Sequence, residues 1–183
     1  NGLNFSYPGY NEILTGAPDA RVDSNAKRPN PNVTVLEWLH QQPGFKGKVA
    51  AFGCWDVFPF ILNRERAGFH VRAGWEIVDE PNPARESIHR VLRATPRVWD
   101  SVTYDAFMFD AALDHIRKTR PKVIYLAFGE TDDWAHDGRY DLYLKAALGF
   151  DRMVGELWAF FQSQPAYRGK TSFLITTDHG RGI

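Results

Sequence analysis

Two Asp/His pairs are the residues of this sequence whose types and spacing could do chemistry. Asp132 and His136 are four residues apart, so one turn of helix would put a carboxylate and an imidazole on the same side. Asp178 and His179 are adjacent, and a turn at Gly180 would let both face one point. Mixed oxygen and nitrogen donors suit zinc-like divalent cations. The two pairs therefore predict a site for two neighbouring metal ions.

Each pair taken alone has a simpler explanation. An exposed acidic turn with an incidental histidine would account for Asp132 and His136, and Asp133 would compete as a ligand. A strand-ending Asp followed by a surface His would account for Asp178 and His179. The pairs gain weight together because each closely follows a predicted strand, and open parallel sheets bind ligands beyond the carboxyl ends of their strands.

Ser6 is the candidate nucleophile, and Asn25 is its candidate partner. The sequence predicts a short helix at about residues 10–15, with Ser6 at N-cap distance and Gly16 at the end. Capping is the simplest role for such a serine, and a turn is the usual role of a lone Asn. A hydroxyl at a helix N-terminus is also placed for attack on a phosphoryl group, and metal coordination would lower its pKa. Asn25 could donate an amide N–H to a phosphoryl oxygen.

Short apolar segments alternate with helix-like segments along the chain. The predicted strands are residues 48–55, 122–128 and 171–177, and the longer predicted helices are residues 34–42, 85–94, 104–119 and 140–162. This alternation predicts an α/β layered sandwich with a central, mostly parallel sheet flanked by helices. We expect residues 1–183 to be a single partial catalytic domain, truncated at both ends, because the sequence stops just after a motif-like stretch.

Composition excludes several classes of partner. The formal net charge is zero, which offers no electrostatic footprint for nucleic acid or an anionic membrane. No apolar run approaches the ~20 residues that cross a bilayer, so no membrane segment is expected. Cys54 is the only cysteine, and its apolar neighbours predict a buried thiol. Four histidines lack a partner at ligand spacing and are predicted to be structural or surface residues: His40, His70, His89 and His115.

The order Ser-x-Pro, then Asp-x-x-x-His, then Asp-His-Gly resembles the alkaline phosphatase superfamily. The resemblance is closest to its phosphodiesterase/pyrophosphatase-like branch and to related uncharacterised bacterial members, and it spans nearly the whole sequence. That branch has Thr-x-Pro at the nucleophile, a Gly ten residues later and an Asn some twenty residues on. Ser6, Gly16 and Asn25 occupy those places.

The resemblance implies a metal-dependent hydrolase of phosphate esters, either a phosphatase or a phosphodiesterase. Ser6 would be the nucleophile, and the cofactors would be two divalent metal ions, with Zn²⁺ the expected metal. Asp132 and His136 would hold the first ion. Asp178 and His179 would hold the second, which Ser6 would face. The substrate would be a small-molecule phosphate ester, and a periplasmic or secreted location would be typical of the family.

The family pattern also includes ligands that this sequence does not carry. It has an Asp on an earlier strand, before Asn1, and a His well after Ile183, so each ion would lack one protein ligand here. Glu130 and Arg181 are possible substrate contacts, although an ordinary loop role is simpler for each.

Two other functions stay open at this stage. One is a sulfatase-like or phosphotransferase member of the same superfamily, although sulfatases carry Cys-x-Pro-x-Arg where this chain has Ser6, Pro8 and Tyr10. The other is a degenerate, non-catalytic binding domain. Because Ser6 and all four Asp/His ligands are retained, the sequence argues against a degenerate, non-catalytic domain.

Overall fold

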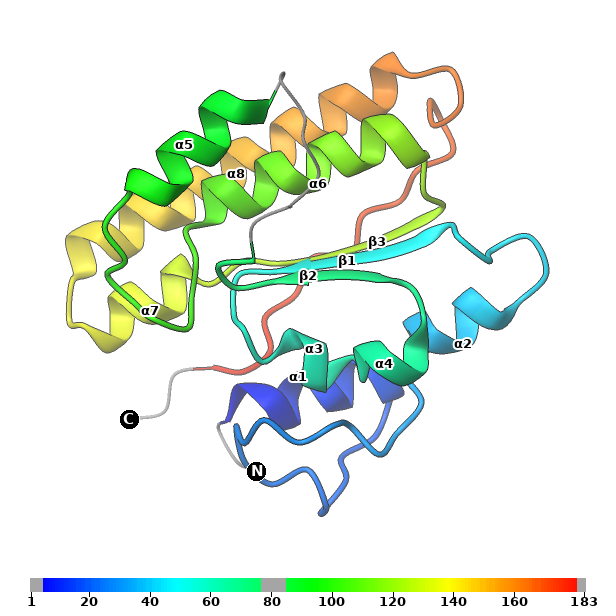
Figure 1. Ribbon diagram of the computed structural model, residues 1–183, viewed down its shortest axis with the longest axis horizontal. Coiled ribbons are helices and arrows are strands. Elements are labelled where there is room, and N and C mark those ends of the chain that lie inside the picture. Colours follow the sequence, from blue (N-terminus) through cyan, green and yellow to red (C-terminus); the bar gives the residue numbers. More distant parts are fainter. Residues whose placement is uncertain (1–4, 77–84, 181–183) are drawn as a thin grey trace.

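The computed structural model describes residues 5–76 and 85–180, which form a sheet covered by helices on both faces (Figure 1). The strands are β1 (Val49–Gly53), β2 (His70–Ala73) and β3 (Val123–Ala127). Their order is β2-β1-β3, and both pairings are parallel. The predicted α/β fold with a central parallel sheet is therefore confirmed.

The helices divide between the two faces of the sheet. One face carries α1 (Ser6–Thr15), α2 (Val35–Gln41), α3 (Phe58–Ile61) and α4 (Arg64–Ala67). The other face carries α5 (Glu86–Ala94), α6 (Asp105–Thr119) and α8 (Tyr140–Ser163), and the short α7 (Glu130–His136) follows β3. Among the described residues, no helix is long and apolar enough to span a membrane.

β1 is the central strand, and its side chains are buried on both faces. Val49 and Ala51 belong to the core under α1–α4, whereas Ala50 and Phe52 belong to the core under α6. Successive side chains of a strand point to opposite faces. Because both faces are covered, the segment is apolar throughout, which is why residues 48–55 were recognisable as a buried strand.

The four longer predicted helices form within one residue of their predicted ends. The short N-terminal helix differs, because α1 already begins at Ser6. The N-cap residue is Phe5, which makes no side-chain capping bond, so the capping role predicted for Ser6 is wrong. Gly16 ends the helix in the left-handed conformation, with φ of 81°, as predicted.

Two strand assignments differ from the prediction. β2 was not predicted, because this short edge strand alternates the charged or polar His70 and Arg72 with apolar residues. Residues 171–177 were predicted as a buried strand, but the structure assigns them no strand. Leu174 is 92% exposed, and the segment is held by Phe173, whose ring packs edge-on against Trp158 of α8 at 5.4 Å. A local apolar run does not determine whether the segment hydrogen-bonds to a neighbouring strand.

Candidate active site

The candidate residues lie where the carboxyl edge of the sheet meets α1. Asp132 and His136 are carried by α7, which begins soon after β3 ends. Asp178 and His179 lie on the segment after α8, which runs past the sheet towards α1 in Figure 1. Segments far apart in the sequence therefore contribute to one region of the molecule.

Gly9 lets the C-terminal segment approach α1 closely. A Cβ atom at this position would collide with the backbone carbonyl oxygen of Asp178. Glycine inside a helix costs about 1 kcal/mol relative to alanine, so its presence needs a local reason. Gly9 was not among the residues predicted from the sequence. The available signal was a glycine one helical turn after the candidate nucleophile, Ser6.

Ser6, His179 and Asp178 converge through their polar atoms. The Oγ atom of Ser6 lies 3.1 Å from Nε2 of His179, although the two residues are 173 positions apart. The Oδ2 atom of Asp178 lies 3.6 Å from the same Nε2, and the hydroxyl of Ser6 hydrogen-bonds to the Asp178 carboxylate. All three groups therefore meet on the Nε2 side of the imidazole.

The other nitrogen of His179 fixes the tautomer of the ring. Nδ1 lies 2.9 Å from the carbonyl oxygen of Gly180, which can only accept, so Nδ1 carries the proton. Nε2 faces the Ser6 hydroxyl and the Asp178 carboxylate. In a Ser-His-Asp triad the carboxylate would bind Nδ1 instead. A histidine that donates one N–H to a backbone carbonyl and aims its free nitrogen at oxygen donors has the arrangement of a metal ligand.

Asn25 binds the first turn of α1 through its amide oxygen. Oδ1 accepts from the backbone N–H of Tyr7 at 3.0 Å. The NH₂ end of the amide is thereby turned away from Tyr7, and it makes no hydrogen bond within residues 5–76 and 85–180. The side chain of a helix N-cap residue usually accepts from an N–H group of the first turn, and Asn25 does this in place of Phe5. Pro8, which follows Tyr7, has no N–H. The amide of Asn25 keeps its two N–H donors available.

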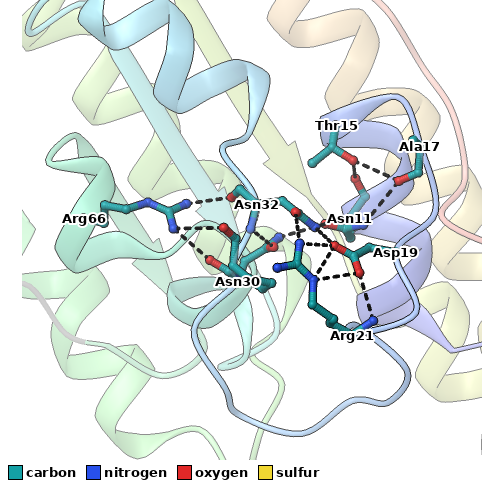
Figure 2. Close-up of polar contacts among 9 residues, drawn as sticks. Asn11, Thr15, Ala17, Asp19, Arg21, Asn30, Asn32 and Arg66 are labelled. Carbon is teal, nitrogen blue, oxygen red and sulfur yellow. Dashed lines mark hydrogen bonds and ion pairs between the residues drawn. The ribbon is translucent and has the colours of Figure 1, made fainter.

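A buried polar network fixes the loop that carries Asn25 (Figure 2). Asn11, fully buried in α1, accepts through Oδ1 from the side-chain amides of Asn30 and Asn32, both at 3.1 Å. Asn32 also donates to Asp19 at 2.8 Å. Buried polar groups that are satisfied in this way hold one conformation, because any other would leave them without partners.

The second pair, Asp132 and His136, is formed within α7. Nε2 of His136 lies 3.3 Å from Oδ2 of Asp132. Two ligands about 2.0–2.1 Å from a tetrahedral zinc ion are themselves roughly 3.3 Å apart, so this spacing fits a shared ion. Asp133, considered above as a competing ligand, is half-buried, and its burial and the charges of Asp132 and Asp137 raise its pKa to about 7.

The two pairs influence one another electrostatically. Burial raises the pKa of the Asp178 carboxyl, and the charge of Asp132 raises it further. Tyr10 of α1 is affected by both carboxylates in addition to its burial, which together raise its pKa well above the usual value. Carboxylates that share a partly buried region repel one another, and a divalent cation would relieve that repulsion.

The residues fit metal ions in donor type and spacing, but each pair supplies only two donors. In the part of the chain that the structure describes, no group of three or more His, Cys, Asp or Glu side chains is arranged to hold one ion. A four-coordinate ion at either pair would need further donors. Arg181, considered above as a substrate contact, lies outside the described residues.

The start of α7 is fixed by a reciprocal pair of capping bonds with α6. Oδ1 of Asp105 accepts from the backbone N–H groups of Gly129 at 2.8 Å and Glu130 at 3.3 Å. In return, Oε1 of Glu130 accepts from the N–H of Asp105 at 2.9 Å. The buried thiol of Cys54 also donates to Asp105, at 3.2 Å. Each helix therefore caps the other, and α7 is held against the end of β1.

Replacing Asp105 with alanine should reduce the free energy of unfolding by about 1–3 kcal/mol, because two partly buried N–H groups lose their acceptor. Asp105 is only 4% exposed, so water cannot replace the carboxylate. Urea unfolding measures the change. Asp105→Asn keeps an acceptor oxygen and should cost less than the alanine variant. Equal losses in the two variants would contradict the capping role.

These features define a class of protein, an α/β fold with its candidate site beyond the carboxyl ends of parallel strands. Residues 97–182 match the model of the Metalloenzyme superfamily, one of the alkaline phosphatase-like families. The match confirms the resemblance to the alkaline phosphatase superfamily over this part of the chain. It includes both Asp/His pairs, whereas Ser6 and Asn25 precede it. Comparison with curated proteins and with solved structures finds no match.

Proposed function

We propose that the protein is a phosphoric ester hydrolase, a phosphatase or phosphodiesterase, that uses Ser6 as nucleophile and two divalent metal ions. The match to the Metalloenzyme superfamily supports a metal-dependent enzyme. The observation that carries it is the convergence of the Ser6 hydroxyl, Nε2 of His179 and the Asp178 carboxylate at the start of α1. This convergence suits a metal that faces the attacking oxygen.

The chain would hold one ion at Asp178 and His179 and the other at Asp132 and His136, with zinc matching the donor types. When bound, such ions supply positive charge that neutralises phosphoryl oxygens and lowers the pKa of a coordinated hydroxyl. The roles of the protein residues follow from their positions. His179 donates its Nδ1–H to the carbonyl oxygen of Gly180, which holds the orientation of the ring.

In the proposed reaction, Oγ of Ser6 forms a bond to phosphorus while the bond between phosphorus and the ester oxygen breaks. The proton of the Ser6 hydroxyl is lost to solvent, and the ester oxygen takes up a proton from solvent and leaves as the alcohol. The start of α1 favours the anionic phosphoryl group, because its dipole is positive there. Asn25 donates its free amide N–H groups to a phosphoryl oxygen. Water then hydrolyses the phosphoserine, and two in-line displacements give net retention at phosphorus.

Activity assays on the intact protein test this function. The protein is stripped with chelator, reloaded with Zn²⁺, Mn²⁺ or Mg²⁺, and assayed on nitrophenyl phosphate, bis-nitrophenyl phosphate and nitrophenyl sulfate. We expect metal-dependent hydrolysis of at least one phosphate ester, faster than that of the sulfate. Faster sulfate hydrolysis would indicate a sulfatase-like enzyme. No turnover, with less than one bound metal ion per chain, would indicate a binding domain.

A further inference from the structure

Arg72 of β2 is a buried charge that makes no direct hydrogen bond or ion pair with the described residues. Arg72 is only 7% exposed, and its Nε atom is buried without a hydrogen-bond partner among the described residues. Within residues 5–76 and 85–180 its guanidinium group makes no hydrogen bond or ion pair. Burial lowers the pKa of Arg72. Unpaired buried charges are strongly destabilising, so this arginine calls for a partner.

Two further nitrogen-bearing side chains lie at the start of α5. Arg85 is the N-cap residue, and His89 follows four residues later, on the same side of the helix. His89 is 5% exposed, and its Nε2 atom is buried without a partner in the described ranges. Arg85 is also almost buried and binds Asp110 of α6 at 2.7 Å and Asp114 at 3.5 Å.

The strand geometry directs Arg72 towards the same turn of α6. His70, two residues earlier in β2, stacks on His115 of α6 with ring centroids 4.4 Å apart. Alternate residues of a strand share a face, so Arg72 also faces α6. α6 runs opposite to the strands, and Arg72 therefore lies beside the turn before His115, where Arg85 is bound. The charge of Arg85 lowers the pKa of Arg72, which agrees with this placement.

The carboxylates in this region are already engaged. Asp110 is paired with Arg85, and Asp114 is shared between Arg85 and Lys118, which lies 2.8 Å away. Glu76 contacts Arg64 instead, at 2.6 Å. None of these carboxylates bonds directly to the guanidinium of Arg72, although their charges act on it at longer range and oppose the lowering of its pKa by burial.

We propose that Arg72, Arg85 and His89 form a binding site for a small oxyanion, between β2, α5 and α6. Guanidinium groups bind phosphate or carboxylate oxygens through paired N–H donors, and His89 adds a further N–H. The first turn of α5 adds backbone N–H groups and the positive end of the helix dipole. The site lies on the opposite face of the sheet from α1, so it does not depend on the proposed reaction.

Thermal unfolding of the intact protein tests this site. The melting temperature is measured with increasing inorganic phosphate at constant ionic strength, in excess chelator so that metal-bound phosphate does not contribute. We expect phosphate to raise the melting temperature of the wild type by roughly 2–4 °C near saturation. Arg72→Met should abolish this shift. Without phosphate, the variant should melt at the same or a higher temperature, because an unpaired buried charge has been removed.

Three controls make the result specific. Arg90→Met removes an exposed arginine of α5 and should keep the phosphate shift, as should Ser6→Ala. Repeating the series with malonate distinguishes a general oxyanion site from one that prefers phosphate. A wild type that does not respond to either anion would overturn the proposal. So would a shift that persists in Arg72→Met, or a variant that is destabilised without anion, since Arg72 would then be balanced by the protein itself.

Discussion

Replacing Ser6 with alanine is expected to lower turnover of phosphate esters by at least about 10³-fold, because the attacking oxygen is lost. The loss should be in kcat, while the bound metal, measured by elemental analysis, stays at the wild-type level. The partly exposed hydroxyl hydrogen-bonds with His179 and the Asp178 carboxylate, and water can replace it, so the free energy of unfolding should fall by only about 0.5–1.5 kcal/mol.

Two further variants make the Ser6 result interpretable. Ser6→Thr keeps a hydroxyl and should retain turnover within about 10-fold, since the family resemblance places threonine there. Ser172→Ala removes an exposed serine from the C-terminal segment and should leave turnover unchanged. Trapping of a phosphorylated protein should succeed with the wild type and fail with Ser6→Ala. Wild-type turnover by Ser6→Ala would exclude the covalent mechanism.

Asp178→Asn is expected to weaken zinc binding by at least about 100-fold. Loss of residues that merely support a metal ligand costs 10–100-fold, so loss of a ligand charge should cost at least the upper end of that range. The substitution keeps the shape of the side chain. It removes a partly buried carboxylate whose pKa is raised by burial and by Asp132, so the metal-free protein should be as stable as the wild type, or more so.

Thermal unfolding with and without zinc measures both effects of Asp178→Asn. The wild type should melt at a higher temperature with zinc, and the variant should lose most of that increase and at least about 10²-fold in turnover. Asp100→Asn, at an exposed position, serves as the matched control and should respond to zinc like the wild type. A variant that melts lower without metal but keeps the full zinc response would show that Asp178 is structural.

Most of the fold could be predicted because its signals are local. Residues 48–55 form a continuous apolar strand since both faces of β1 are covered, and the predicted helices show apolar spacing with recognisable ends, such as Thr34 before α2. β2 was not predicted, because this four-residue edge strand contains His70 and Arg72 and therefore has no continuous apolar run. Residues 171–177 have the composition of a strand, but pairing depends on another segment and not on composition.

The sequence by itself determined which residues could do chemistry, through the types and spacing of the Asp/His pairs and the position of Ser6. Only the tertiary structure decided that Ser6 lies beside His179 and that Gly9 permits this approach. It also decided that Asp105 caps α7 and that Arg72 is buried without a direct hydrogen bond or ion pair to the described residues. The physical reason is that spacing along the chain controls neighbours within one turn or strand, whereas contacts across 173 residues depend on how the layers pack.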